Sequence, residues 1–192
     1  MGNNQSHIIS EVCDALTGNN HESASKIARD VYPFIPIQIT NRRYTEHQSV
    51  SLFIRDGFLD RYSGEPLIFP ATLRLLSKLL PDEFPFHPNW KMSETHIAYW
   101  ELFPTVDHIV PIARGGIDLE ENWVTTSMIR NSAKSNWTLE ELDWELLAPG
   151  EIRPWSGLMS WFLEYVDHHP ALLADKYLRR WQRAAISLVT EH

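Results

Sequence analysis

The sequence predicts an α+β fold in which helices from both ends of the chain surround one short β-hairpin. Apolar residues recur at helical spacing in the first third of the chain and again after Gly150, whereas β-branched residues cluster between Thr105 and Thr126. With 192 residues, 43% of them hydrophobic, the chain is long enough to bury a core. We expect one compact unit with an N-terminal helical segment (1–44), a central segment (45–147) and a C-terminal helical segment (148–192).

Helices are expected first at residues 8–16 and 23–32, with the Gly-Asn-Asn sequence at 18–20 between them. Residues 33–36, which contain two prolines, predict an extended linker. The next helix should begin after Thr45, whose hydroxyl can cap its first turn, and end near Gly57; another should follow Pro70, over residues 71–80.

The pattern changes in the middle of the chain. Residues 81–103 are rich in proline and aromatic residues, with a helical turn expected at 93–99. Residues 105–110 and 123–126 favour strands, and the segment between them contains two adjacent glycines, so a hairpin with a long loop is expected.

Helical spacing returns after the hairpin, over residues 127–135. The sequence Thr138-Leu139-Glu140-Glu141 is a capping box, which predicts the start of another short helix. Two further helices are expected at residues 156–167 and 171–189.

Composition limits the chemistry. The net charge of −8 argues mildly against nucleic-acid binding, although a groove with local positive charge or a bound divalent cation can offset it. Cys13 is the only cysteine, which excludes an intramolecular disulfide and a zinc site of several thiolates. The first residues lack a secretory signal and no apolar run spans a bilayer, so we expect a cytoplasmic protein without a membrane partner.

Five polar residues between Thr105 and Asn136 could form a hydrolytic site: Asp107, His108, Asn122, Asn131 and Lys134. A neutral imidazole can take a proton from water, while a hard cation neutralises charge on a phosphoryl group. Asp107 and Asn131 offer the oxygen ligands that Mg²⁺ or Mn²⁺ prefers. Adjacent strand residues face opposite ways, so Asp107 and His108 can serve one site only if the chain twists or leaves the strand there.

These residues resemble the HNH nucleases, whose fold is called ββα-metal. The resemblance consists of Asp107-His108, Gly115-Gly116, Asn122, Asn131, and Lys134 with Asn136, at the family's spacing. A looser resemblance to a bacterial HNH subfamily covers residues 43–144, through Arg-Asp-Gly-Phe at 55–58, Tyr-Ser-Gly at 62–64 and Trp-Lys-Met-Ser-Glu-Thr-His at 90–96.

The resemblance implies an endonuclease that uses one divalent ion, Mg²⁺ or Mn²⁺, to hydrolyse phosphodiester bonds, with DNA as the expected partner. It makes His108 the general base and Asp107 and Asn131 the metal ligands. Asn122 would fix the loop that carries the base, and Lys134 would contact phosphate unless it is a solvated helix residue. Double-strand cutting by an enzyme with one site would suggest a homodimer or successive nicks.

One departure from the family concerns zinc. Many members hold a structural zinc with two Cys-x-x-Cys pairs, whose counterparts here are Asp60 with Ser63 and Ser127 with Arg130. None of these four can supply a thiolate, so we expect no structural zinc and an ion pair between Asp60 and Arg130 in its place.

Other readings stay open. The chain could be a non-catalytic nucleic-acid-binding or assembly module with a vestigial site, which the acidic charge favours, or a delivered nuclease toxin. His87 and His96 precede the hairpin and could border the site, but packing or turn roles are expected. The eight tryptophans are expected mainly in the core, although an exposed one near the hairpin could stack on a base.

Overall fold

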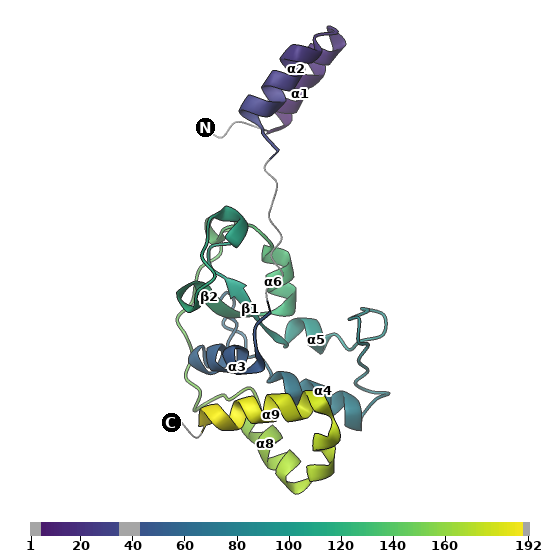
Figure 1. The fold of residues 1–192 in the computed structure, drawn as a ribbon, viewed down its shortest axis with the longest axis vertical. Coiled ribbons are helices and arrows are strands. Elements are labelled where there is room, and N and C mark those ends of the chain that lie inside the picture. The colour runs from purple at the N-terminus through teal and green to yellow at the C-terminus, as the bar shows by residue number, and fades with distance from the viewer. Residues whose placement is uncertain (1–4, 35–42, 190–192) are drawn as a thin grey trace. The chain divides into compact units, whose positions relative to one another are not determined.

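The computed structural model describes residues 5–34 and 43–189 (Figure 1). These two ranges form two separate compact units. The C-terminal segment packs within the same unit as the central segment, whereas the N-terminal helices form a unit of their own. The structure therefore differs from the single compact unit expected from the sequence.

The first unit is a pair of helices packed on one another, α1 (Gln5–Thr17) and α2 (His21–Val31). Their contact buries Ile8 and Ala24. The side chain of Asn20 caps α2 by accepting a hydrogen bond of 3.0 Å from the Ser23 amide. Of the linker expected at 33–36, only the first two residues are described and they are not helical.

The described part of the second unit combines helices, irregular segments and one two-stranded sheet, so the fold is α+β. Its helices are α3 (Glu46–Arg55), α4 (Pro70–Leu79), α5 (Ala98–Glu101), α6 (Met128–Lys134), α7 (Leu139–Leu142), α8 (Met159–His168) and α9 (Lys176–Val189). Short 3-10 turns lie at Ile112–Arg114, Glu120–Asn122 and Pro170–Ala174. Strands β1 (Pro104–His108) and β2 (Trp123–Ser127) pair antiparallel, from Pro104 opposite Ser127 to His108 opposite Trp123.

Local sequence explains where these elements begin. Thr45 forms a capping box with Gln48 at the start of α3, and Thr138 forms another with Glu141 at α7, as expected. Pro70 is the first residue of α4, a position where its missing amide hydrogen costs no helical hydrogen bond. Ser127 ends β2 and accepts from the Arg130 amide, so one residue ends the strand and caps α6.

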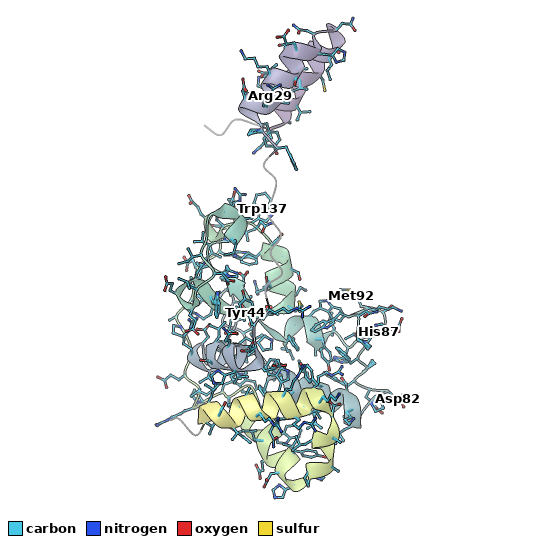
Figure 2. All side chains as sticks on the ribbon, viewed as in Figure 1. Arg29, Tyr44, Asp82, His87, Met92 and Trp137 are labelled. Carbon is cyan, nitrogen blue, oxygen red and sulfur yellow. The ribbon has the colours of Figure 1, made fainter. Side chains whose placement is uncertain are left out.

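Two boundaries differ from the sequence-based prediction. The helical turn expected at 93–99 lies at α5 instead, and the last helix begins at Lys176 rather than at residue 171. Proline starts a separate 3-10 turn at Pro170–Ala174, and Asp175 Oδ1 then accepts hydrogen bonds from the next turn's amides, which starts a new helix. In Figure 2 the labels Asp82, His87 and Met92 mark the segment before α5, on the right of the second unit.

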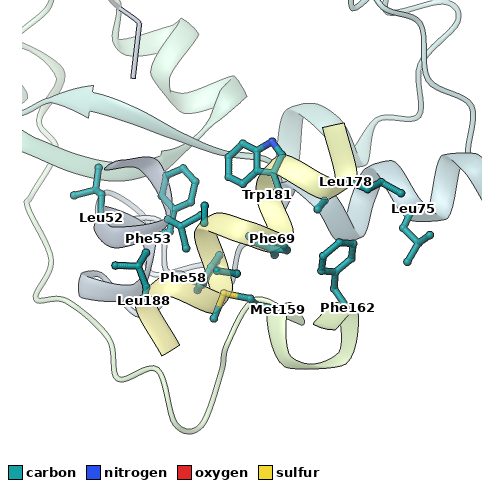
Figure 3. Close-up of a cluster of buried hydrophobic side chains, with 14 of the residues drawn as sticks. Leu52, Phe53, Phe58, Phe69, Leu75, Met159, Phe162, Leu178, Trp181 and Leu188 are labelled. Atoms are coloured by element: carbon teal, nitrogen blue, oxygen red, sulfur yellow. The ribbon is translucent and has the colours of Figure 1, made fainter. Parts of the chain in front are cut away.

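Helices α3, α4, α8 and α9 enclose the main core (Figure 3). Phe69 is at its centre, with ring centroids 5.4 Å from Phe162 and 5.6 Å from Trp181. Trp123 is buried in the same cluster, so the start of β2 belongs to the core that the helices build. Within the described residues, none of the helices has the length and apolar character needed to cross a membrane.

A buried ionic cluster fixes the hairpin to α3. Asp56 is fully buried, and its Oδ1 accepts from Arg55 at 3.0 Å and from Arg61 at 2.8 Å. Its Oδ2 accepts from the backbone amide of Thr125 in β2 at 2.8 Å. Gly57 follows at a φ of 66°, and a Cβ there would lie 2.4 Å from the backbone of Gly150. The Arg-Asp-Gly-Phe sequence at 55–58 is therefore explained by packing and by support of β2.

Candidate active site

The candidate site is built on a continuous strand, loop, strand and helix from Pro104 to Lys134. Helix α6 packs on both strands. The face of β1 that carries Thr105 and Asp107 is turned toward α6, because both side chains contact residues of that helix. Val106 packs instead against the main core, as the alternation of a strand requires.

Asp107 is buried, and its carboxylate is shared by two donors. Tyr62 donates its hydroxyl to Asp107 Oδ2 at 2.7 Å, and the Lys134 ammonium lies 3.0 Å from the same oxygen. Both of these contacts use Oδ2, and among the described residues Oδ1 is the oxygen to which a further ligand could be added. Burial, and then the neighbouring Asp107 charge, raise the pKa of Tyr62, so its hydroxyl stays a proton donor in this contact.

Lys134 has no exposed surface, which excludes the solvated position considered from the sequence. Its ammonium also donates to the backbone oxygen of His108 at 2.7 Å. It therefore ties the end of β1 to α6, a position that differs from the expected phosphate contact.

Asn131 lies on the same face of β1 as Asp107. Its Nδ2 donates to Thr105 Oγ1 at 3.0 Å and to the Val106 backbone oxygen at 3.2 Å. Because both hydrogen bonds are donated by Nδ2, the side-chain oxygen is turned away from them and is available as a ligand.

The imidazole of His108 lies on the other face of β1, at the end of the strand. Its Nε2 is 2.8 Å from Asp118 Oδ1 and 3.4 Å from the Tyr44 hydroxyl. Asp118 also accepts from the Trp123 indole at 2.9 Å and from Tyr44 at 3.2 Å. Partial burial alone would raise the pKa of Asp118, but the hydrogen bonds from His108, Trp123 and Tyr44 together outweigh it and hold that pKa below its ordinary value.

Asn122 closes the loop between the strands. Its Oδ1 accepts from the Val110 amide at 2.9 Å, while its Nδ2 donates to the backbone oxygens of Val110 and Ile117 at 2.9 and 2.8 Å. Gly116 makes this closure possible, since a Cβ there would lie 1.9 Å from the Val110 oxygen. These contacts are those of a residue that fixes the loop following His108.

The structure thus brings Asp107, Asn131 and Lys134 together on the α6 face of the hairpin, and it places the His108 side chain on the opposite face. Lys134 spans the two, because it contacts both the Asp107 carboxylate and the His108 backbone. In the described part of the chain, no three His, Cys, Asp or Glu side chains are grouped so that they could hold a metal ion. A cation at Asp107 would need the amide oxygen of Asn131 and ligands from outside the protein.

The ion pair expected in place of zinc is present. Arg130 Nε lies 3.7 Å from Asp60 Oδ2, and Asp60 is buried. The same carboxylate accepts from the Ser127 amide at 2.9 Å and from the Thr126 hydroxyl at 3.1 Å, so its main partners belong to the end of β2. Ser63 faces away from the pair and accepts from the Glu65 amide instead.

The two histidines before the hairpin have the turn and packing roles expected. His87 accepts from the Asn89 amide, and His96 accepts from the Ala98 amide while stacking on Phe84 at 4.2 Å.

Three residues of the site were missed from the sequence: Tyr44, Tyr62 and Asp118. Asp118 is the hydrogen-bond partner of the candidate base, yet it occurs in a glycine-containing loop where aspartate is an ordinary turn residue. Tyr62 lies within the Tyr-Ser-Gly sequence singled out above, which was the one available signal. Tyr44 is 64 positions from its partner His108, and no local pattern could have paired them.

We found no match for this chain among protein-family models, curated proteins or solved structures.

Proposed function

We propose that this protein is a metal-dependent endonuclease of the HNH class, with a ββα-metal core formed by β1, β2 and α6. His108 is the general base, and Asp107 and Asn131 are the metal ligands. One observation carries the proposal: α6 and β1 present Asp107 and Asn131 on one face, and the contacts between described residues leave one side-chain oxygen of each for a ligand, beside the strand end that carries His108.

The residues fit a hard divalent cation. Two protein oxygens leave most of the coordination positions to water and phosphate, as is usual for Mg²⁺. When bound, Mg²⁺ or Mn²⁺ would neutralise charge on the phosphoryl oxygens and on the leaving oxygen. The Lys134 ammonium contacts Oδ2 of Asp107 and holds this carboxylate in place, while Oδ1 would face the cation.

His108 is oriented by Asp118. With the carboxylate accepting from Nε2–H, the lone pair of the imidazole lies on Nδ1, which can take a proton from water. Asp118 then stabilises the positive charge that the imidazole acquires. Tyr44 donates to Asp118 and limits the rotation of that carboxylate.

His108 is the last residue of β1, so its side chain and that of Asp107 leave opposite faces of the strand at its end. The next pairing is made by the loop, where the Ile109 amide donates to the Asn122 backbone oxygen, and Asn122 holds the chain beyond it. A phosphate lying across this end would contact the Asp107 side from one edge and the His108 side from the other. Asn122 therefore supports activity by fixing the loop rather than by touching the substrate.

Purified protein incubated with plasmid DNA and Mg²⁺ or Mn²⁺ tests the proposal. We expect cleavage by the wild type, none after EDTA is added, and a loss of roughly 10²- to 10⁴-fold in His108→Ala. His168→Ala is the matched control, because His168 is exposed on α8 and bonds only its own helix among the described residues.

Wild-type protein that binds nucleic acid but cleaves neither DNA nor RNA with either metal would contradict the enzyme and favour a non-catalytic module. The fold of His108→Ala should be checked by its thermal unfolding midpoint. Cleavage that persists in folded His108→Ala would remove the histidine from its assigned role.

A further inference from the structure

A pocket of about 440 Å³ opens beside the candidate site, between α3, α4, α9 and the segment before β1. Seven of its lining side chains are aromatic, among them Tyr44, Trp90 and Tyr177. Pockets of this size accommodate small organic groups, which they usually hold with apolar walls and a few polar atoms. An aromatic lining of this kind suits a flat π system better than a flexible aliphatic chain.

Tyr44 connects this pocket to the candidate site. Its ring forms part of the pocket wall and packs edge-on against Trp123 at 4.8 Å. Its hydroxyl lies 3.4 Å from His108 Nε2 and 3.2 Å from Asp118. A group bound in the pocket would therefore lie one side chain away from the proposed base.

Arg74 brings a positive charge to the pocket, which is also lined by Glu46, a carboxylate paired with Arg180 at 3.0 Å. The Arg74 guanidinium carbon lies 3.8 Å from the centroid of the Phe86 ring and 5.3 Å from that of Tyr177. The same arginine lines an adjoining hollow of about 340 Å³ together with Lys78, one helical turn further along α4. Asp175 also lines this hollow and lies 3.5 Å from Lys78 Nζ, so it offsets the lysine charge, and Arg74 is the cation that suits a phosphate group there.

We propose that the aromatic pocket holds one unstacked base of a nucleic-acid strand, with an adjacent phosphate on the side of Arg74. The inference rests on the proposed function, in that the substrate is a nucleic acid. Base stacking on aromatic side chains supplies affinity without sequence readout, because every base has a π face. The pocket thereby selects single-stranded or locally opened nucleic acid close to the cleaved bond.

The test is a binding assay in which no cleavage is needed. Full-length His108→Ala protein is titrated into a labelled single-stranded oligonucleotide and into one of the same length whose bases are replaced by abasic sites. We expect the base-containing strand to bind roughly 5- to 150-fold more tightly, the range for stacking of one base. Adding Trp90→Ala should remove most of this preference, whereas Trp90→Phe should retain it.

Trp161→Ala is the matched control, since Trp161 is a partly exposed tryptophan on α8 outside the pocket. Arg74→Met is a second pocket variant that removes the charge but no ring, and we expect it to weaken both strands and to reduce the salt dependence. Thermal unfolding confirms that each variant is folded.

Equal binding of the two strands by protein with an intact pocket would overturn the inference. So would a preference that survives in folded Trp90→Ala, because stacking would then occur elsewhere. The proposed function fails separately, if the wild type does not cleave with either metal. Cleavage without any preference for bases would remove the pocket from substrate binding and leave the nuclease assignment intact.

Discussion

In the proposed site, Asp118 accepts a hydrogen bond from Nε2–H of His108, so that Nδ1 is the nitrogen without a proton. We expect Asp118→Asn to lower cleavage, because an amide is neutral and can donate to the imidazole, which would stabilise the wrong tautomer. The loss should be smaller than that of His108→Ala, since the imidazole itself remains. Initial cleavage rates of the two variants, measured side by side, check the order. An Asp118→Asn protein that cleaves as fast as the wild type would show that this contact does not orient the proposed base.

The Asp118 carboxylate should also affect how the free energy of unfolding depends on pH. Because the folded-state pKa of Asp118 is lowered, its stabilising contribution is present above the ordinary carboxyl pKa and is lost as the pH falls through the folded-state value. Wild type should therefore be more stable than Asp118→Asn at neutral pH, and the difference should disappear under acidic conditions. Urea unfolding of the wild type and of Asp118→Asn at several pH values measures this difference. A difference in stability that grows on acidification would contradict a lowered pKa of Asp118 in the folded state.

Lys134 is the residue whose removal should cost most stability within the site. Lys134→Met leaves the buried Asp107 carboxylate with the Tyr62 hydroxyl but without its counter-charge, and breaking such a pair costs about 3–5 kcal/mol. Lys91→Met breaks an exposed pair with Glu94 and should cost less than about 1 kcal/mol. Urea titrations of Lys134→Met and Lys91→Met give the two free energies of unfolding to be compared. Similar small losses in both would mean that Lys134 is better solvated than its burial indicates.

At the scale of elements, the loop between the strands depends on Asn122. Asn122→Asp keeps the shape but directs a carboxylate oxygen at the backbone oxygens of Val110 and Ile117, where the amide donated two hydrogen bonds. We expect a loss of a few kcal/mol, because leaving buried polar groups unpaired costs about 1–3 kcal/mol each. The rate of cleavage by Asn122→Asp should fall together with this stability. Circular dichroism and urea unfolding measure the loss, and an unchanged free energy of unfolding would show that the loop closes without this residue.

Element boundaries were predictable wherever one residue determines them locally. Thr45 and Thr138 are capping residues with a matching partner three positions on, and Pro70 and Ser127 mark the starts of α4 and α6. The start of α9 was not predictable to the same degree, because the apolar spacing continues through the 3-10 turn before it. There the 3-10 turn ends and α9 begins at a backbone change at Asp175, without a break in the hydrophobic pattern.

The candidate site was predictable as a set of residues and not as an arrangement. The spacing identified Asp107, Asn131 and Lys134, which lie together on the α6 face of the hairpin because they belong to one short segment. The burial of Lys134 and the pairing of His108 with Asp118 depend on how the loop folds back, and Tyr44 and Tyr62 arrive from segments 64 and 45 positions away. Such long-range contacts leave no periodic signal in one sequence.

At the scale of the whole molecule, the site is supported by a core that its own segment cannot build. Trp123 belongs to the core cluster that α3, α4, α8 and α9 build, and Val106 packs against this cluster, while α6 of the same segment covers the opposite face of β1. A two-stranded hairpin is marginal alone and needs such packing. The C-terminal helices are thus part of the scaffold for the candidate site, although they contribute no side chain to its proposed chemistry.

The division into two units predicts opposite effects of two deletions. Removing residues 1–41 should leave the thermal midpoint of the remaining chain and its metal-dependent cleavage close to those of the full protein, because the core and the site lie in the second unit. Removing residues 148–192 takes Phe162, Leu178 and Trp181 from that core. Each large core side chain is worth about 2–5 kcal/mol, and their sum exceeds the stability of roughly 5–15 kcal/mol expected of a domain. The protein without residues 148–192 should therefore lack a cooperative unfolding transition in near-ultraviolet circular dichroism. A cooperative, active protein without residues 148–192 would show that the hairpin and α3 fold independently of the C-terminal helices.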